Sequence, residues 1–346
     1  SAKQVIHAAQ YTGAIILLAK ADQLAVYLQS DLEMYVRGVL RSEIPATYHI
    51  EAMKAQAILA RTYALRPRID HSSQGFNVCD SYLCCQAFNG IDPALSEEQA
   101  QAIKATRGKT LSYAGKPALA LFSANAGGHT ENYSNCFSNL QTNQFPDIAI
   151  PYLKGIAEGK LPEGFPRESA MRKLYADAHP ETIDAWSPSF RWKVSLPADA
   201  LECHLHHVIE TLQQDPQFSP FISAPLSGKF GHVQSFAVLK RGVSGVAMEL
   251  EIKTSTGSWK IAKELTIRSA FANVDLKLKR LRSARIFFDQ QQDKLGLLKN
   301  LTIYGLGFGH GVGLQQNGAQ KLALEGMSAE AMLQRYYPGT TISTVD

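Results

Sequence analysis

The sequence lacks long apolar runs and long basic runs, two features that assign many chains to a broad class. The apolar run Gly13–Ala19 is far shorter than the roughly 20 residues of a transmembrane helix, and we interpret it as a buried strand. The net charge is only +4, and Lys and Arg do not form a long run. We therefore expect no nucleic-acid partner, whereas weak attraction to an acidic polymer is compatible with this charge.

Cysteine is scarce, and its number is odd, because the 346 residues include five. Complete pairing into internal disulfides is therefore impossible. Cys136 and Cys203 are predicted to be small buried residues. The segment Cys79–Cys85 holds the other three thiols, and His71 precedes it by eight residues. A metal site, a disulfide in an exported protein, and reduced buried thiols all fit this spacing, which leaves the three alternatives open.

The motifs of nucleotide-binding proteins and of HExxH zinc enzymes are also absent. Gly305–Gly313 has a glycine at every second residue, but it matches neither a phosphate-binding loop nor a dinucleotide-binding GxGxxG pattern. Alternating glycines allow a ligand or another backbone to approach closely, and tight strand packing is the alternative. His310 lies inside this run and is a candidate binding residue.

Apolar periodicity predicts a mixture of helices and strands along the chain. With 45% hydrophobic residues, the chain can bury a large core. The predicted helices are one capped by Ser30 and Glu33 and stopped by Pro45, three at 50–63, 96–108 and 201–212, and one starting at Ser328. The predicted strands lie at 14–19 and 24–28, in a hairpin at 110–122 and in a meander at 230–268.

Glu43 lies between the first predicted helix and Pro45, at a position where a carboxylate does not favour helix stability. The helix dipole disfavours negative charge near a helix C-terminus, and partial burial adds to this effect. Both effects favour the protonated form that a general acid needs. The alternative is a solvated glutamate at a helix end, and local sequence does not choose between them.

Two further regions offer candidate binding residues. Lys54 and Arg61 are seven residues apart on the second helix, so they project from nearly the same side and could bind a ligand or orient a nearby acid. A solvated helix face is the alternative. Ser123–Asn132 is a polar, glycine-rich loop at the end of a buried strand, where functional residues often lie.

Several segments together resemble the SpoIID family of peptidoglycan lytic transglycosylases, also called the stage II sporulation protein D and amidase-enhancer family. The resemblance covers roughly residues 20–155 and 280–346. The segments that carry it are Leu32–Pro45, Glu51–Leu65, Ala105–Leu111, Ser123–Glu131, Gly307–Gly313 and Tyr336–Thr340.

The resemblance implies an α+β fold, with mixed helices and antiparallel sheets around a substrate groove and a less regular inserted subdomain. It also implies an enzyme that cleaves glycan strands from which amidases have removed the stem peptides. It places the catalytic acid at Glu43, and functional lysine and arginine residues at Lys54 and Arg61. It also implies that the loops containing GGHTE and GHG line the substrate groove. The binding residues expected from these loops are Ser123, Asn125, Gly128, His129, Glu131 and His310.

The resemblance also implies a cysteine-ligated zinc site, which some members of the family have at the positions of Cys79 and Cys85. His71 is the third ligand expected in this chain. This chain departs from the pattern, because Cys84 stands where a histidine is often found and His71 lies farther from Cys79. The proposed reaction itself requires no cofactor. The sequence Leu314–Ala319 also departs from the usual Met-Ser-Gln-Tyr-Gly-Ala.

The sequence thus predicts a SpoIID-type core formed by residues 1–155 and 281–346, with an inserted or second subdomain at 156–280. The predicted function is cleavage of bonds between N-acetylmuramic acid and N-acetylglucosamine, which yields 1,6-anhydro products. The alternative is a non-catalytic glycan-binding activator of a cell-wall amidase. Peptidoglycan strands and an amidase are the expected partners, and the expected location is extracytoplasmic. The chain starts with Ser-Ala and not with Met, so we expect an added remnant or a removed leader.

Overall fold

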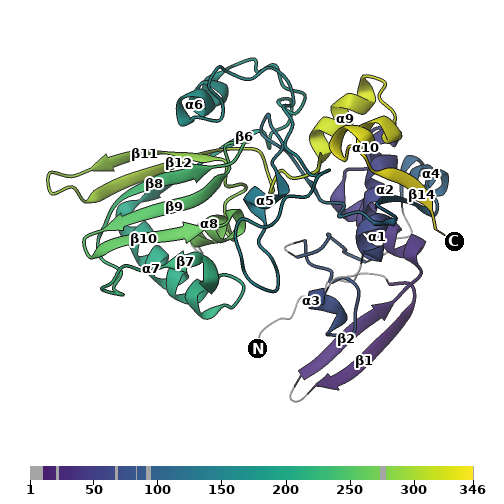
Figure 1. Ribbon diagram of the computed structural model, residues 1–346, viewed down its shortest axis with the longest axis horizontal. Helices are drawn as coiled ribbons and strands as arrows, with labels where there is room; N and C mark the ends of the chain where they lie inside the picture. Colours follow the sequence, from purple (N-terminus) through teal and green to yellow (C-terminus); the bar gives the residue numbers. More distant parts are fainter. Residues whose placement is uncertain are drawn as a thin grey trace. The chain divides into compact units, whose positions relative to one another are not determined.

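A computed structural model describes residues 11–20, 23–66, 69–82, 84–90, 95–272 and 278–345 (Figure 1). Its mixture of helices and mainly antiparallel strands confirms the predicted α+β class. The chain forms two compact units: unit 1 comprises Ser1–Leu121 and Ala319–Asp346, and unit 2 comprises Phe122–Gly318. The predicted subdomain at 156–280 lies inside unit 2, which begins earlier and ends later along the chain.

Unit 1 contains a helical core, a small sheet with strand order β14-β3-β4, and a separate hairpin. Its elements are β1 (Ala14–Lys20), β2 (Gln23–Gln29), α1 (Leu32–Glu43), α2 (Ile50–Leu65), α3 (Ile69–Ser72), α4 (Glu97–Ala105), β3 (Lys109–Tyr113), β4 (Lys116–Pro117), α10 (Ala329–Tyr336) and β14 (Thr341–Thr344). A further helix, α9 (Gln316–Leu324), begins in unit 2 and continues into unit 1.

Helix α2 is the centre of unit 1 because it is buried along most of its length. Met53 and Ala57 of this helix pack with Val36 of α1 and Ile103 of α4 in one apolar cluster. The small alanine side chains of α2 allow neighbouring elements to approach it closely. The alanine-rich composition of α2 therefore suits its position inside the unit.

Helix capping agrees with the sequence at two helices and differs at a third. Ser96 and Gln99 form a capping box at the start of α4, which agrees with the predicted start at residue 96, and Ser328 caps α10. At α1 the cap is Asp31, whose side chain accepts hydrogen bonds from the backbone N–H groups of the first turn. The predicted capping box of Ser30 and Glu33 is therefore wrong, because Glu33 points its carboxylate to another partner, described below.

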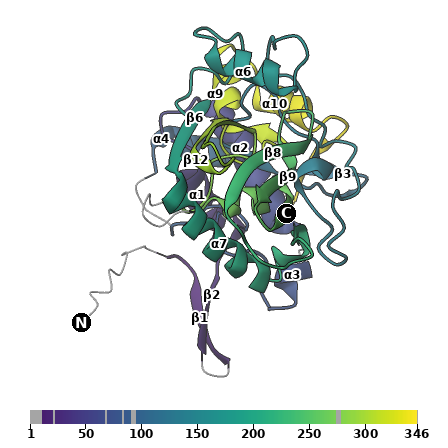
Figure 2. The ribbon, with the colours of Figure 1, turned by 90° about the vertical axis from the view of Figure 1, so that its left-hand side faces the viewer.

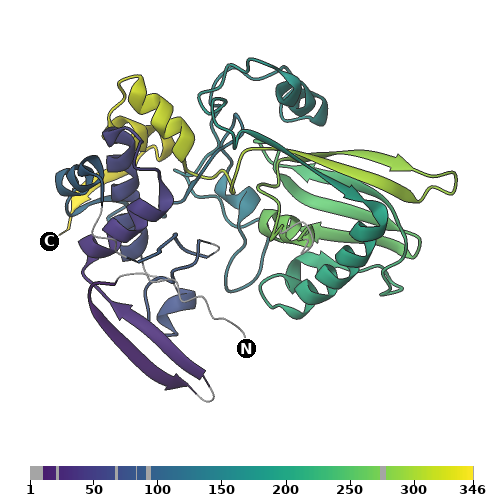
Figure 3. The same cartoon turned by 180° about the vertical axis from the view of Figure 1, so that it is seen from behind.

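Strands β1 and β2 form a hairpin that extends away from the helices of unit 1 (Figure 1, Figure 3). The predicted strand at 14–19 is confirmed, but its predicted burial is wrong. Ile15 is 60% exposed and Leu17 is 57% exposed. A two-stranded ribbon has no second layer of its own, so apolar side chains on its faces remain in contact with solvent.

Unit 2 contains two antiparallel sheets, with strand orders β7-β10-β9-β8 and β11-β12-β6, and a short parallel pair of β13 with β5. Its strands are β5 (Phe122–Ser123), β6 (Arg191–Pro197), β7 (Ile222–Ser223), β8 (Val233–Arg241), β9 (Ala247–Thr254), β10 (Gly257–Ala262), β11 (Ile286–Gln292), β12 (Leu298–Leu306) and β13 (Leu314–Gln315). The predicted meander is confirmed in β8, β9 and β10 and ends in a helix.

The helices of unit 2 are α5 (Tyr133–Cys136), α6 (Glu168–Ala176), α7 (Ala198–Gln214) and α8 (Glu264–Ala270). Helix α7 packs against β6, β12 and α8 (Figure 2). Cys136 is buried as predicted, but Cys203 on α7 is exposed, so that part of the prediction is wrong. None of the described helices combines the length and the apolar character needed to cross a bilayer.

Candidate functional site

Glu43 is the last residue of α1, and the chain turns into an extended conformation at Ile44 before Pro45. Its predicted place between helix and proline is therefore confirmed. The side chain is half-buried, and its Oε1 atom accepts a hydrogen bond from the backbone N–H of Ala87 at 2.6 Å. This bond holds the carboxyl group at the surface of unit 1 without enclosing it completely.

The segment Gln86–Asn89 binds along α1 and thereby positions the partner of Glu43. Gln86 donates a side-chain hydrogen bond to the hydroxyl of Tyr35 at 3.1 Å, and the N–H of Asn89 donates to Ser42 Oγ at 3.1 Å. The ring of Phe88 stacks on Tyr35 with a centroid distance of 5.3 Å. The N–H group that contacts Glu43 is thus fixed by contacts on both of its sides.

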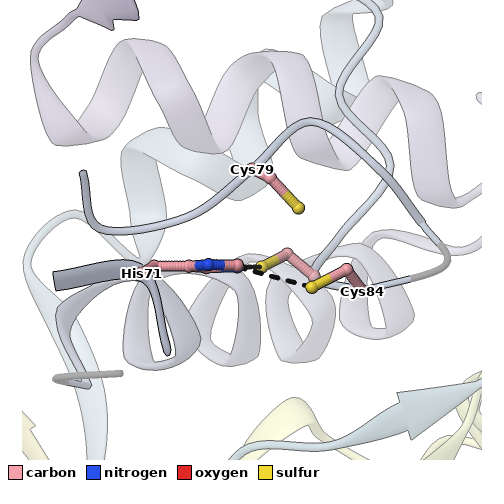
Figure 4. A group of neighbouring side chains, drawn as sticks. His71, Cys79 and Cys84 are labelled. Carbon is pink, nitrogen blue, oxygen red and sulfur yellow. Dashed lines mark hydrogen bonds between the residues drawn. The ribbon is translucent and has the colours of Figure 1, made fainter. Parts of the chain in front are cut away.

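His71, Cys79, Cys84 and Cys85 form a cluster whose possible ligand atoms all lie within 4.8 Å of one another (Figure 4). His71 Nε2 lies 3.2 Å from Cys85 Sγ and 3.4 Å from Cys84 Sγ. All five cysteines are described, and none forms a disulfide in this structure. The structure thus brings together the three residues named from the sequence and adds Cys84.

Three thiolates and one imidazole are a donor set that tetrahedral zinc accepts. Around such an ion, ligand atoms lie about 3.6 to 3.8 Å apart, which follows from metal–ligand bonds of about 2.0 to 2.3 Å. The observed separations at His71 are close to this range. The four residues therefore fit a closed structural site, in which no position remains open for substrate.

The cysteine cluster and Glu43 are neighbours of the same tyrosine, Tyr35. Burial raises the pKa of Tyr35, and negative charge on Cys85 and Glu43 raises it further. Cys85 also precedes Ala87, the hydrogen-bond partner of Glu43, by two residues. An ion held by the cluster would consequently restrain the segment that positions Glu43.

Lys54 lies on α2, where its ammonium group pairs with Glu51 at 2.6 Å. The other carboxylate oxygen of Glu51 accepts the N–H of Ala329, at the start of α10. Burial by itself would raise the pKa of Glu51, but the bonds from Lys54 and Ala329 lower it. Lys54 therefore helps to join α2 to α10, and contact between its half-buried side chain and substrate stays a prediction.

Arg61 is fully buried, so the alternative of a solvated helix face is wrong for this residue. Its guanidinium forms a bidentate pair with Glu33 of α1, at 2.7 and 2.8 Å, and donates to the carbonyl of Lys109 at 2.9 Å. The pair joins α1, α2 and β3. The pair accounts for the direction of the Glu33 carboxylate, which does not take part in a capping box. It indicates a structural role for Arg61, and contact of Arg61 with substrate stays a prediction.

We expect Arg61→Lys to reduce the free energy of unfolding by about 2 kcal/mol, because a lysine cannot reproduce the bidentate pair with Glu33. Denaturant unfolding measures this change. Arg107→Lys is the matched control, since Arg107 is exposed in the same unit. If Arg61→Lys kept full stability and lost only glycan binding, the structural interpretation would be wrong.

In unit 2 the structure brings the loops 123–131 and 307–313 together. The backbone of Asn125 exchanges two hydrogen bonds with that of Phe308, at 2.9 and 3.1 Å. The Asn125 side chain is buried and donates to Asn317 Oδ1, and Gly128 N–H donates to Asp184. Ser123 is also buried, on the strand that pairs with β13. The two loops named from the sequence therefore form one structural element.

Glu131 is a buried anchor within this element. Its carboxylate accepts hydrogen bonds from the N–H and the hydroxyl of Ser244, from the N–H of Val243, and from Asn132 and Asn135. These bonds hold the turn between β8 and β9. The role of Glu131 as a sugar contact remains a prediction, and its geometry is that of a structural carboxylate.

Two histidines in these loops are held in their neutral forms. Burial lowers the pKa of His129, and burial also lowers the pKa of His310 to about 4. His310 Nδ1 accepts the N–H of Val312 at 2.9 Å, so the neutral ring carries its proton on Nε2. Near neutral pH both rings are therefore uncharged, and the His310 ring is already hydrogen-bonded to the backbone of Val312 and Phe122.

Arg285 is the residue of this element that sequence reasoning missed. It is fully buried on β11's N-terminal side, and its guanidinium donates to four backbone carbonyls. The acceptors belong to Asn125, Leu306, Gly309 and His310, at 3.1 to 3.3 Å. An arginine in an apolar stretch gives no local signal of this role, because its acceptors come from distant segments.

The alternating glycines allow the chain to wrap around this guanidinium. Gly307, Gly309, Gly311 and Gly313 all have positive φ angles, between 75° and 98°. A Cβ atom at Gly307 would lie 2.6 Å from an Arg285 nitrogen, and one at Gly311 would lie 2.3 Å from another. The predicted close approach is therefore real, and the group that approaches is a buried arginine.

Comparison with known proteins finds two family models along the chain. The family model described as Stage II sporulation protein matches residues 20–113, and a domain of unknown function, DUF8618, matches residues 143–313. The chain is 27% identical to an amidase enhancer of Bacillus subtilis (strain 168), over 89% of this chain and 40% of that protein.

Stage II sporulation protein D of the same organism is also 27% identical, over 96% of this chain and 82% of that protein. A stage II sporulation protein D of Bacillus amyloliquefaciens matches over 91% of this chain and 75% of its own length, again with 27% identity. Together with the family model that matches residues 20–113, these relatives show that the chain contains a SpoIID-type region and is similar to stage II sporulation protein D and amidase enhancer proteins over most of its length.

Proposed function

We propose that this protein is a peptidoglycan lytic transglycosylase that acts on peptide-free glycan strands outside the cytoplasm. The observation that carries the proposal is the position of Glu43, a half-buried carboxyl group at a helix end that one backbone N–H orients at 2.6 Å. The similarity to SpoIID proteins supports it. Glu131, the carboxylate of the GGHTE motif, is committed to five hydrogen bonds, which is compatible with a reaction that uses one acid.

In the proposed reaction, protonated Glu43 donates its proton to the glycosidic oxygen between N-acetylmuramic acid and N-acetylglucosamine. The bond between that oxygen and muramic C1 breaks. The carboxylate then accepts the proton of the muramic C6 hydroxyl, and the C6 oxygen forms a bond to C1. The products are a 1,6-anhydromuramyl end and a free N-acetylglucosamine hydroxyl, so no water is consumed and Glu43 returns to its initial state.

The test is incubation of the protein with peptide-free glycan strands, followed by mass spectrometry of the products. We expect fragments with 1,6-anhydromuramyl ends. Reducing ends that carry one added water would show hydrolysis instead, and would contradict the transglycosylase mechanism. Intact strands after long incubation at high protein concentration would contradict cleavage altogether.

The name of the amidase enhancer relative supports a second candidate function, a glycan-binding activator of a cell-wall amidase. This function needs a glycan-binding surface and no acid. It predicts that Glu43→Gln leaves the stimulation of an amidase on intact cell walls unchanged. Loss of stimulation in a stable Glu43→Gln protein would favour the enzyme over the activator.

We also propose that zinc occupies the cluster of His71, Cys79, Cys84 and Cys85 as a structural ion. When bound, zinc would cross-link the segment from residue 71 to residue 85. The proposed reaction does not use the Lewis acidity of the ion. These four residues would hold the ion, and the segment from Cys85 to Ala87 would keep the hydrogen bond to Glu43 in place.

Elemental analysis should find one zinc per chain in the purified protein, and Cys79→Ser should abolish binding. Cys203→Ser is the matched control, because Cys203 is an exposed thiol in unit 2. Removing the ion with a chelator should lower the thermal unfolding temperature by several degrees, since the ion binds the folded state preferentially. A protein that neither contains zinc nor takes it up would refute the structural-ion proposal.

A further inference from the structure

Unit 2 contains an open cavity of about 600 Å³ that the proposed reaction chemistry does not use. His129 of the GGHTE motif contributes to its lining, together with the chain around Phe165 and the end of strand β8. The cavity therefore joins a residue of the family motif to residues of the region 143–313, whose matching domain has no known function. Its volume is sufficient for one or two sugar rings.

Part of the cavity lining is apolar. Leu161, Pro162, Phe165 and Met248 all line it. The Phe165 ring lies nearly parallel to that of His129, with an angle of 16° and a centroid distance of 6.0 Å. Flat apolar surfaces of this kind accommodate the C–H face of a pyranose ring or the methyl group of an acetamido substituent, because both remove apolar area from water.

His129 adds a hydrogen-bond acceptor to the cavity lining. Its Nδ1 atom lies 2.6 Å from the carbonyl of Thr130, a distance that requires a proton on Nδ1. Burial lowers the pKa of His129, so the ring is neutral near pH 7 and its Nε2 atom carries a lone pair. A sugar hydroxyl or an amide N–H is the matching donor.

Lys240 contributes a cation to the cavity lining, and its cross-strand neighbour Glu249 pairs with Lys260 at 3.6 Å. The neighbouring Arg241 pairs with Glu168 at 3.0 Å and donates to the carbonyls of Gly245 and Ile286. Lys240 is exposed and forms no side-chain hydrogen bond or ion pair with the described residues. Of the two cations that line the cavity, Lys240 is thus the one available to an anionic ligand.

Glu131, a buried carboxylate behind the cavity-lining Gly242, is engaged with donors other than Lys240. A Cβ atom at the cavity-lining residue Gly242 would lie 2.4 Å from an oxygen of Glu131, so Glu131 lies directly behind this wall. Both of its oxygens accept hydrogen bonds from the turn between β8 and β9, including two from Ser244. Its charge is therefore directed to these donors and away from the opening.

We infer that this cavity binds a saccharide residue that carries a carboxylate, and that Lys240 recognises the carboxylate. In peptidoglycan that group is the lactyl carboxylate of N-acetylmuramic acid, which is free only where the stem peptide has been removed. Lys240 is therefore a specificity-determining residue for peptide-free strands. This inference rests on the proposed function, because it deepens the choice of substrate.

The test measures binding in a Glu43→Gln background, which prevents turnover. Two ligands are compared: a short peptide-free glycan, and the same glycan with its lactyl carboxylates converted to methylamides. We expect the charged ligand to bind about tenfold more tightly, as a charge-assisted hydrogen bond at a partly exposed site allows. Lys240→Gln should remove this difference, and Lys240→Arg should retain most of it.

Lys253→Gln is the matched control, because Lys253 is an exposed lysine on the adjacent strand β9 and does not line the cavity. It should leave the tenfold preference unchanged. If Lys240→Gln weakened binding of both ligands equally, or left the preference intact, the inference would be overturned. Failure of the proposed function would be a separate result, namely the absence of anhydromuramyl products from the wild-type protein. The affinities for the two ligands can still be compared in that case.

Discussion

Replacing Glu43 with Gln is expected to reduce the rate of anhydromuramyl product formation by about a thousandfold or more, since the proposed reaction has one acid and base. Glutamine has nearly the same shape, and its amide oxygen can still accept the N–H of Ala87 at the observed position. Stability should therefore change by less than about 1 kcal/mol. The measurement is the rate of appearance of anhydromuramyl ends, together with thermal unfolding of both proteins.

The control for this experiment is Glu98→Gln, which makes the same chemical change at an exposed helix position in unit 1. It should leave both rate and stability unchanged. A Glu43→Gln protein that folds normally and cleaves strands at the wild-type rate would exclude Glu43 as the acid. Glu43→Asp provides a graded result, because a shorter carboxyl group retains the proton but lies farther from the glycosidic oxygen.

Replacing Arg285 with Met is expected to reduce the free energy of unfolding by about 4 kcal/mol. Methionine supplies an apolar side chain of similar length, but it leaves four buried carbonyls without their donor. Because two of these carbonyls belong to Gly309 and His310, the loop around them should loosen first. Hydrogen exchange of residues 305–313 should consequently become faster than exchange in β8 and β9.

Arg282→Met is the matched control, because Arg282 is exposed and lies three residues before Arg285. It should change stability by less than about 0.5 kcal/mol. Arg285→Lys should fall between the two, since lysine keeps the charge but lacks the planar fork that reaches four acceptors. Equal stability of the Arg285→Met and wild-type proteins would refute the view that this guanidinium holds the glycine loop.

Local sequence predicted most elements of the fold because their signals act over a few residues. The helix that ends at Glu43, the helix that begins after Ser96 and the meander of β8 to β10 are all present. The capping prediction at Ser30 failed, because Asp31 competes for the same N–H groups from one residue farther along. Two adjacent capping residues cannot be ranked without the geometry of the first turn.

Burial was predicted less well than secondary structure. The apolar strand β1 is exposed, whereas the charged Arg61 is buried. Strand formation depends on the residues themselves, but burial depends on what packs against them, and a hairpin alone provides no covering layer. Arg61 is buried because Glu33 and the carbonyl of Lys109, both distant in sequence, satisfy its donors.

By itself the sequence determined the resemblance to SpoIID proteins, the candidate acid Glu43 and the presence of a cysteine cluster, because each of these depends on residue types at short spacing. Only the tertiary structure decided that Cys84 joins His71, Cys79 and Cys85. It also decided that the alternating glycines enclose Arg285. These contacts join segments up to 160 residues apart, as between Asn125 and Arg285, and no local pattern encodes such a pairing.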